Sequence, residues 1–281
     1  MSAPATIGAK TLEDLGWPQL VEHWARRCAT TRGAAAVRLA PLFQAAAAAE
    51  RRIVEIAEAR ALLVKDAALP FGGIEHVEAA VGRAEKGGLL EPVELVAVAH
   101  SARGLARLRH HLRHHAELTP RLGEIGSALD DLDHVYLPIL EAFDPEGRLV
   151  DHASEALGPL RRAVAAVRAQ LETRLAGMVE DPRYVEFLQD TYYTQRDDRY
   201  VLPVRAQHKG YVHGIVHGTS QSGQTVFLEP DEIVDLNNRL KLAECEVADE
   251  ERRILVRLTG WIAEEASSLR RGLAAAEVLD G

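Results

Sequence analysis

Aromatic residues and cysteines are scarce in this sequence. Phe, Trp and Tyr together make up 5% of the 281 residues, whereas hydrophobic residues make up 47%. The two cysteines, Cys28 and Cys245, lie far apart, which favours a reduced intracellular protein over one held together by disulfides. Ala, Leu, Glu and Arg dominate instead, and because these are strong helix formers the composition predicts a mainly helical fold.

The sequence also lacks long apolar runs and a phosphate-binding loop. No segment approaches the roughly 20 apolar residues of a membrane-spanning helix, and residues 1–10 show no signal-peptide pattern. We therefore expect a soluble, cytoplasmic protein without membrane partners. No Gly-x-x-x-x-Gly-Lys-Ser/Thr run or close variant occurs, so we expect no nucleotide site within these residues.

Positive charge is in deficit, with 33 Lys and Arg against 42 Asp and Glu and a formal charge of −9. This balance argues against a surface that coats nucleic acid everywhere, because phosphate neutralisation needs clustered cations. A local contact is still compatible with it, since residues 196–213 carry four basic and two acidic residues. Residues 229–251, in contrast, carry nine acids and two bases and should repel phosphate.

The first 150 residues have the pattern of a helical core. Near-helical apolar spacing predicts a helix that starts at Thr11, with Thr11 and Asp14 resembling a capping box, and ends near residues 30–33. A second helix should follow Pro41 and run through the alanine-rich stretch to about Lys65. Its expected apolar stripe consists of Ile53, Ile56, Leu62 and Leu63.

Turn-forming residues divide the rest of this core. Turns are predicted at residues 69–73, 87–88 and 143–147, with a short helix over 74–83. Pro92 should open a long helix that ends near Ala116, since proline fits the first helical turn. Further helix is expected from about residue 120 to Phe143.

Two amphipathic stretches follow, separated by about fifty residues of different character. The first has an apolar seam at Leu157, Leu160, Val164, Val167, Leu171, Leu175 and Met178. The second has one at Ile233, Leu236, Leu240, Ala243, Val247, Ile254 and Leu258. Spacings of three and four residues place each seam on one helix face, so we expect a pair of antiparallel coiled-coil arms.

The segment between the arms has the residues of β-strands. Runs at 199–204, 211–217 and 225–228 are rich in Tyr, Val, Ile, Thr and Phe, with a turn at 218–223. Pro203 cannot donate a ladder hydrogen bond, so its strand should lie at an edge. The predicted fold is therefore mainly α, with a helical core and long arms that carry a small β-hairpin or sheet.

Several runs in this segment resemble a signature of the bacterial MutS-II family, which is related to the mismatch-repair ATPases. They are residues 194–204 (TQRDDRYVLPV), 214–217 (GIVH), 219–230 (TSQSGQTVFLEP) and 234–238 (VDLNN). The starts at 11–13 (TLE) and 71–74 (FGGI) are also similar. The matching signature positions are Tyr200, Pro203, Gly214, His217, Ser222, Gly223, Phe227, Glu229, Pro230, Asn237 and Asn238. One position departs, because the resemblance implies an acidic residue where this chain has Gly218.

The resemblance implies a division into a lever domain at 1–152, a clamp at 153–258 with its β tip at about 195–230, and a returning lever helix at 259–281. It also implies an ATPase domain, using ATP and Mg²⁺, and a C-terminal Smr nuclease domain, both beyond residue 281. The expected ligands are the backbone of branched or duplex DNA or a stalled ribosome, and the family member is expected to form a homodimer. No catalytic residue, metal or cofactor is expected within this chain.

Four basic residues of the β tip are the candidates for touching a nucleic-acid backbone. They are Arg196, Arg199, Arg205 and Lys209. Backbone contacts need only mobile cations and exposed amides. The alternative is that these residues form ion pairs with Asp197, Asp198 and acids of the arms.

Three other groups have a structural interpretation that we prefer. Ser220, Ser222, His217 and Glu229 suggest a hydrolase triad, but serines in a turn can instead bond local backbone amides. His110, His111, His114 and His115 have helical spacing suited to zinc, but no third ligand is indicated, and a solvated basic face is expected. Asn237 and Asn238 are expected to cap a helix or to bridge to the hairpin.

The resemblance therefore implies a non-catalytic clamp and lever region that binds nucleic acid, in a family that acts to suppress homologous recombination or to rescue ribosomes. The alternative is a structural coiled-coil module that self-associates without binding nucleic acid. The acidic second arm favours this alternative.

Overall fold

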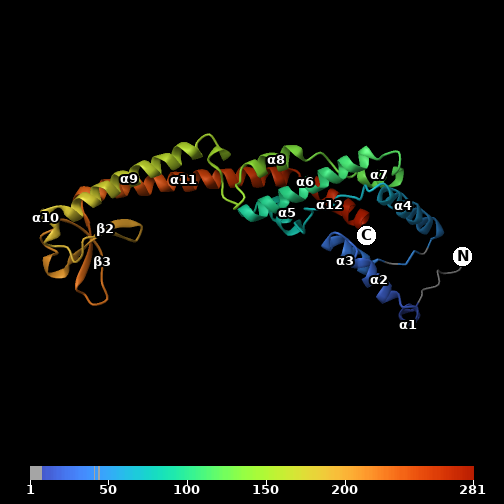
Figure 1. The fold of residues 1–281 in the computed structure, drawn as a ribbon, viewed down its shortest axis with the longest axis horizontal. Helices are drawn as coiled ribbons and strands as arrows, with labels where there is room; N and C mark the ends of the chain where they lie inside the picture. The colour runs from blue at the N-terminus through green and yellow to red at the C-terminus, as the bar shows by residue number, and fades with distance from the viewer. Residues whose placement is uncertain (1–7, 41, 44) are drawn as a thin grey trace. The chain divides into compact units, whose positions relative to one another are not determined.

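The computed structural model describes residues 8–281 except 41 and 44. Helices dominate, and a small four-stranded antiparallel sheet lies between two long helices in the chain order, as Figure 1 shows. The described part of the chain divides into two compact units. Unit 1 contains residues up to 149 together with 255–281, and unit 2 contains residues 150–254. The mainly helical fold with a small β element is confirmed, while the domain boundaries at 152 and 258 stay predictions.

Unit 1 is all-helical. Its helices are α1 (Ala9–Asp14), α2 (Trp17–Ala25), α3 (Thr31–Leu39), α4 (Ala46–Val64), α5 (Glu78–Glu85), α6 (Pro92–His114), α7 (Pro120–Gly126), α8 (Asp133–Glu141), the end of α11 (Asp231–Glu264) and α12 (Ala266–Asp280). Among the described helices of both units, none is long and apolar enough to cross a membrane.

Helix α6 is the centre of unit 1. It begins at Pro92 as predicted, and Glu91 and Glu94 form a reciprocal capping box at its start. The residues Leu95, Val98, Ala102, Leu105, Leu108 and Leu112 repeat every three or four positions and are almost fully buried. At Gly104, a Cβ atom would lie 2.6 Å from the Ile74 side chain, so glycine allows the 72–74 turn to approach the helix closely.

The first predicted helix is wrong in its extent. Gly16 adopts a φ of 71°, which ends α1 and separates it from α2, and α2 itself ends at Ala25. Thr11 lies inside α1, whose N-cap is Gly8, so the proposed capping box is also wrong. The N-cap of α3 is Thr30, whose hydroxyl accepts a hydrogen bond from the Gly33 amide at 2.9 Å.

Helix α4 is confirmed from Ala46 onwards, so the alanine-rich stretch is helical after its N-cap, Ala45. Pro41, where we expected this helix to follow, lies outside the described residues. The predicted apolar stripe is wrong for three of its four members. Only Leu62 is buried, whereas Ile53, Ile56 and Leu63 are exposed.

The inner face of α4 instead carries a carboxylate, Glu58, which is 8% exposed. Its oxygens accept hydrogen bonds from the amides of Arg121 at 3.0 Å and Leu122 at 2.9 Å, in the first turn of α7. These amides have no partner inside the helix, and the positive end of the helix dipole favours an anion there. Glu58 therefore joins two helices that are more than sixty residues apart in the chain.

Asp280 has the same role at the end of α12. Its carboxylate accepts hydrogen bonds from the amides of Ala29 at 2.7 Å and Thr30 at 2.8 Å and from the Thr30 hydroxyl at 2.6 Å. A Cβ atom at Gly33 would overlap this carboxylate, so glycine leaves the space it occupies. The side chain of Asp280 thus connects the last helix of unit 1, α12, to the N-terminal end of α3.

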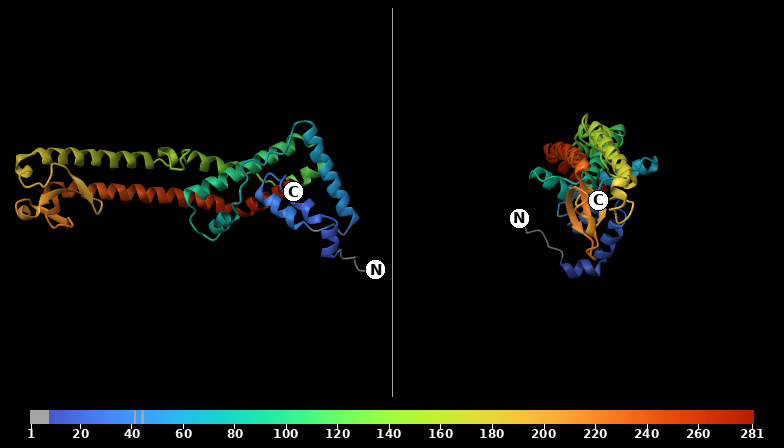
Figure 2. Two further views of the ribbon diagram at one scale, coloured as in Figure 1. Left: turned by 60° about the horizontal axis from the view of Figure 1, so that its bottom comes forward. Right: turned by 90° about the vertical axis from the view of Figure 1, so that its left-hand side faces the viewer.

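Unit 2 begins with two long helices that run antiparallel. They are α9 (Leu157–Glu180) and the part of α11 up to residue 254, and they lie side by side in Figures 1 and 2. Arg161 pairs with Glu251 and Arg168 with Glu244, each at 2.8 Å. The two arginines are seven residues apart on α9, and their partners are seven residues apart on α11 in the reverse order, as an antiparallel pair of helices requires. Nearer the sheet, Leu171, Leu175 and Met178 are buried against Ile233 and Leu240.

The sheet of unit 2 follows α9 and a short helix, α10 (Pro182–Val185). Its strands are β1 (Thr194–Arg196), β2 (Arg199–Arg205), β3 (Gly214–Thr219) and β4 (Thr225–Pro230), in the spatial order β1-β2-β4-β3. Strand β1 was not predicted, and β3 begins and ends later than the predicted 211–217 run. Leu202 opposes Leu228, and Val204 opposes Val226.

The strand that contains Pro203 is not at an edge, so that prediction is wrong. The pairing of β1 with β2 reaches only Val201, and the Pro203 carbonyl accepts a hydrogen bond from the Gln189 amide at 2.7 Å. Because the N and O atoms of one strand residue point to the same side, the missing N–H of Pro203 faces that loop. Proline therefore costs no bond to β4.

We predict that Glu58→Ala destabilises the junction of α4 with α7 by about 2–3 kcal/mol, because it leaves charge-assisted hydrogen bonds unmade. Hydrogen exchange at the Arg121 and Leu122 amides should accelerate, as measured by mass spectrometry of a peptide covering 117–128. Glu50→Ala is the control, since Glu50 is an exposed residue of the same helix. Equal exchange in the two variants would contradict this role of Glu58.

Candidate nucleic-acid interface

We call the four strands β1–β4 and the loops that connect them the β element of unit 2. It is built around one carboxylate, that of Glu229 in β4, which has no exposed surface. Arg199 of β2 approaches it at 2.8 Å, His217 of β3 at 2.6 Å and the Asn237 amide of α11 at 2.9 Å. A buried charge is costly unless it is paired and hydrogen-bonded. These three partners, from three different elements, satisfy both carboxylate oxygens.

A β-bulge brings His217 to this carboxylate. Val216 pairs with Leu228 and Gly218 with Phe227, so His217 is the extra residue of β3. Bulges change the direction in which a side chain points, and here the imidazole meets Glu229. Gly218 follows the bulge with a φ of 142°, a conformation that side-chain-bearing residues rarely adopt. The departure from the family pattern at this position therefore coincides with a backbone that favours glycine.

Asn237 connects the start of α11 to strand β2. Its side chain accepts a hydrogen bond from the Tyr200 amide at 3.1 Å and donates one to the Tyr200 carbonyl at 3.0 Å. Asn238 accepts a hydrogen bond from Arg199 at 2.7 Å. The two asparagines thus form the bridge to the sheet that was one of their two expected roles.

The remaining signature positions have structural surroundings. Tyr200 and Phe227 are buried, and the Tyr200 hydroxyl donates to Glu172 at 3.3 Å. A Cβ atom at Gly214 would overlap the Glu229 carbonyl oxygen, so only glycine allows β3 to lie this close to β4. Pro230 ends β4 and is paired in register with Gly214.

The Ser220–Gly223 turn supports the structural interpretation of its serines. The Ser220 hydroxyl accepts a hydrogen bond from the Thr225 amide at 3.1 Å and lies 3.3 Å from the Ser222 hydroxyl. Gly223 has a φ of 70°, as a tight turn requires. His217 is hydrogen-bonded to Glu229 at 2.6 Å, so the serines belong to a turn and the histidine to the Glu229 network.

The structure separates the four candidate basic residues into two groups. Arg196 and Arg199 are register partners on β1 and β2, and Arg205 lies at the opposite end of β2, about 20 Å away along the strand. The Arg196 guanidinium lies over the Phe227 ring at 4.3 Å, and Arg199 is held by Glu229. Arg205 and Lys209 are exposed and have no carboxylate partner within the β element, which is described throughout.

Asp198, one of the two acids beside these arginines in the sequence, has another partner. It pairs with Lys241 of α11 at 2.8 Å, which holds the pKa of this carboxyl below its ordinary value. The expected pairing of Arg199 with a carboxylate does occur, but with Glu229. The role of the four basic residues in nucleic-acid contact stays a prediction.

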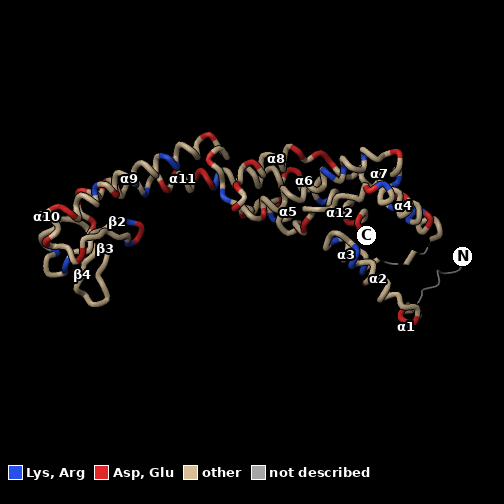
Figure 3. The backbone as a smooth tube through the Cα atoms, viewed as in Figure 1, with Lys and Arg blue, Asp and Glu red and all other residues tan. Residues whose placement is uncertain are grey.

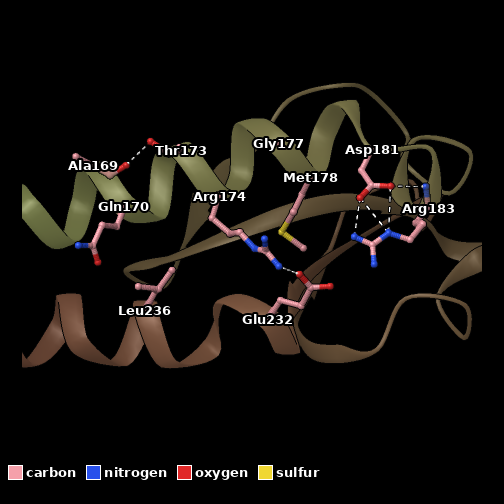
Figure 4. A pocket seen from close by; sticks show the side chains of 10 residues that line it. All are labelled: Ala169, Gln170, Thr173, Arg174, Gly177, Met178, Asp181, Arg183, Glu232 and Leu236. Carbon is pink, nitrogen blue, oxygen red and sulfur yellow. Dashed lines mark hydrogen bonds and ion pairs between the residues drawn. The ribbon is translucent and has the colours of Figure 1, made fainter.

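A hollow of about 740 Å³ lies where α9, α10 and α11 meet, and Figure 4 shows its lining. Arg174 pairs with Glu232, and Arg183 pairs with Asp181 at 2.7 Å. The Tyr184 hydroxyl donates to Glu232 at 2.7 Å, and burial together with this carboxylate raises the pKa of Tyr184 to about 12. The charged side chains that line this hollow pair with one another and connect α9, α10 and α11. They are therefore better explained as contacts between these helices than as groups that bind a ligand.

The four histidines at the end of α6 belong to unit 1, and two of them, His110 and His114, are exposed as expected. His111 and His115 are half-buried, with ring centroids 4.6 Å apart, and a His111 ring nitrogen lies 3.0 Å from the Ala67 carbonyl oxygen. Burial and the neighbouring histidines lower the pKa of His115. Over the described residues, no group of three or more His, Cys, Asp or Glu side chains is arranged to hold a metal ion.

Three aromatic residues near Arg205 and Lys209 were missed in the sequence. Phe187, His208 and Tyr211 cluster on the surface of the β element, with Phe187 and Tyr211 stacked at 5.2 Å. The signal was weak, since Phe187 precedes the predicted strands and lies more than twenty residues from Tyr211. Tyr211 itself was assigned to a strand rather than to a loop.

This architecture defines a class of helical protein in which two antiparallel helices carry a small sheet. No family profile matches the chain. It is 39% identical over 275 residues to "Endonuclease MutS2" of Anaeromyxobacter sp. (strain Fw109-5), covering 97% of this chain and 34% of that protein.

Similar relatives occur in other bacteria. The protein of the same name from Symbiobacterium thermophilum is 35% identical over 272 residues, covering 96% of this chain and 34% of that protein. The one from Synechocystis sp. is 33% identical over 291 residues, covering 99% and 34%. The chain therefore belongs to the MutS2 (MutS-II) family, and it spans about a third of the length of these relatives.

We predict that Asn237→Ala lowers the free energy of unfolding of unit 2 by about 2–3 kcal/mol, because it leaves the Tyr200 amide and carbonyl without partners. Urea unfolding followed through the β element measures the loss. Asn238→Ala is the matched control and should cost less than about 1 kcal/mol, since it removes one bond at an exposed site. Similar losses for the two variants would argue against the bridge through Asn237.

Gly218→Glu, which introduces the acidic residue implied by the family resemblance, should destabilise unit 2 by about 1–3 kcal/mol because of the backbone conformation at this position. Gly210→Glu adds the same charge in the neighbouring loop, where the backbone φ is not positive, and serves as the control. Thermal unfolding of both variants measures the difference. If Gly218→Glu were as stable as Gly210→Glu, the bulge would not require glycine.

Proposed function

We propose that this chain is the lever and clamp region of a MutS2-family protein and that the end of its β element near Arg205 and Lys209 contacts the phosphate backbone of nucleic acid. The observation that carries the proposal is the exposure of these two cations without a carboxylate partner in the β element. Contacts of this kind position a protein on nucleic acid without reading bases.

The surrounding structure supports a fixed placement of the two cations. Arg205 ends β2, and its amide donates to the Phe187 carbonyl at 2.9 Å. Val212 lies in the loop between β2 and β3, which also carries Lys209. It is buried and anchors that loop. The Glu229 network holds the strands on which both cations depend. Arg199 serves this network, so its contribution to binding is structural.

The arms differ in charge from this end of the β element. Acids of α11 bind arginines of α9, as Arg161–Glu251 and Arg168–Glu244 illustrate, and Figure 3 shows both signs of charge along the two helices. Several further acids of α11, including Asp231 and Asp235, are exposed. A phosphate backbone is repelled there and attracted at Arg205 and Lys209, which confines the contact.

In the whole protein this region has no turnover of its own. The ATPase domain, with ATP and Mg²⁺, moves the arms of a homodimer, and the β elements close on branched DNA or on the RNA of a stalled ribosome. The name of the relatives assigns an endonuclease activity to those proteins; we place such an activity outside the residues of this chain. A purely self-associating coiled-coil module is the competing function.

The test is a salt titration of binding to a four-way DNA junction, measured by fluorescence anisotropy. Affinity should fall as salt rises, and the Arg205→Ala/Lys209→Ala double variant should lower the slope of log K against log salt by up to about 1.8, since each phosphate contact contributes about 0.9. Arg252→Ala, at an exposed position of α11, is the control and should leave the slope unchanged. Absence of binding at low salt would support the self-association module instead.

A further inference from the structure

An aromatic cluster lies directly beside the two free cations. The Phe187 and Tyr211 rings stack nearly parallel, with 9° between their planes and 5.2 Å between their centroids. The His208 ring meets both of them edge to face, at 5.7 Å and 5.9 Å. Arg205 and Lys209 flank His208 in the sequence, and the Arg205 amide binds the Phe187 backbone. Leu188 forms a bridge with Val204, so Phe187 and Arg205 face each other across two neighbouring segments, and Lys209 lies on the loop that carries His208 and Tyr211.

The cluster has a firm base in the core of unit 2. Phe187 packs against the hydrophobic core, and Val212, the residue after Tyr211, belongs to that core. The Tyr211 amide donates to the His208 carbonyl at 2.9 Å, and the Ala206 amide donates to the Gln224 carbonyl at 2.9 Å. The loop that carries His208 and Tyr211 is thus fixed at both ends.

Tyr211 is nevertheless 68% exposed. Its ring rests on Phe187 with one side and offers much of the rest to solvent. The Nδ1 atom of His208 is buried without a hydrogen-bond partner, and its Nε2 atom lies 3.5 Å from the Gln207 side-chain amide, so the ring edge of His208 packs against the two aromatic rings. An exposed ring on a rigid base, with cations on the same loop, has the components of a site that stacks a base and neutralises its phosphates.

A paired duplex cannot use such a site fully. Its bases are stacked on one another inside the helix, and only phosphates and groove edges are accessible. Unpaired bases at branch points, ends and loops can be splayed out and stacked on aromatic side chains. The chemistry of the cluster therefore favours nucleic acid with an unpaired segment over a continuous duplex.

We propose that Tyr211, supported by Phe187 and His208, stacks on an unpaired nucleobase while Lys209 and Arg205 neutralise the adjoining phosphates. This inference rests on the proposed backbone contact and adds a preference for unpaired nucleotides to it. Unpaired DNA at a branch and unpaired RNA in a loop present the same chemistry. An apolar segment of a partner protein is the other possible occupant of an exposed tyrosine, but the adjoining cations favour a polyanion.

The experiment compares binding of the 281-residue chain to a single-stranded DNA oligonucleotide, a single-stranded RNA of the same sequence and a blunt DNA duplex of the same length. Tyr211→Ala should weaken binding to the single strands by about 5- to 150-fold and leave duplex binding within about twofold. Tyr211→Phe should retain wild-type affinity, since it keeps the ring. The relative affinity for the two single strands identifies the source of the unpaired bases.

Tyr192→Ala is the matched control, because Tyr192 is also an exposed tyrosine of unit 2 but is outside the cluster. It should leave all affinities unchanged. Tyr211→Leu, which keeps apolar bulk without a ring, should resemble Tyr211→Ala and replaces it if that variant is unstable.

The outcomes separate a failure of this inference from a failure of the proposed function. Salt-sensitive binding that prefers no single strand and is insensitive to Tyr211 overturns the stacking site while leaving the backbone contact intact. Absence of binding to every probe at low salt overturns both. A loss caused equally by Tyr211→Ala and Tyr192→Ala would also reject a specific role for the cluster.

Discussion

The buried carboxylate of Glu229 is the constraint on which the β element depends. An anion without solvent must be surrounded by donors, and these come from β2, from the bulge of β3 and from α11. Each donor fixes the element that carries it, so the strands and the helix that follows them are positioned together. Residues spread from Arg199 to Asn238 are therefore explained by one local requirement. Removing any one of the donors would leave part of a buried charge uncompensated, which is more costly than losing an exposed contact.

This requirement divides the basic residues of the β element by role. Arg199 forms an ion pair with Glu229, and the Arg196 guanidinium lies over the Phe227 ring. Arg205 and Lys209 lie outside the Glu229 network, beside a stacked pair of aromatic rings. These two cations are therefore the members of the candidate set that no carboxylate of the β element neutralises. In the arms, by contrast, Arg161, Arg168 and Arg174 are each matched by an acid of the facing helix, and their charge stabilises the pair of helices.

Periodic features of this fold could be predicted from the sequence, whereas features that depend on distant partners could not. The seams of α9 and α11 and the start of α6 at Pro92 follow from local spacing and capping, and the structure confirms these helices. The apolar residues of α4 were predicted to face the core, but three of them are exposed. Hydrophobicity alone does not reveal that Glu58 faces inward and binds the amides of α7. Strand β1 is three residues long and exists only through its pairing with β2. The bulge at His217 and the cluster around Tyr211 likewise depend on contacts between segments that local patterns do not connect.

The ion pairs between α9 and α11 also make the helical pair a spacer of adjustable length. Because Arg161–Glu251 and Arg168–Glu244 are each one heptad from the next, removing or adding seven residues in both helices would preserve every facing position. Such a change would move the sheet by about 10 Å along the helices and turn it by only about 20°. A single residue added to α11 would instead rotate the rest of that helix by about 100° and turn a different face of α11 toward α9. The reach of the β element can therefore vary in discrete steps while its orientation on the helices changes little.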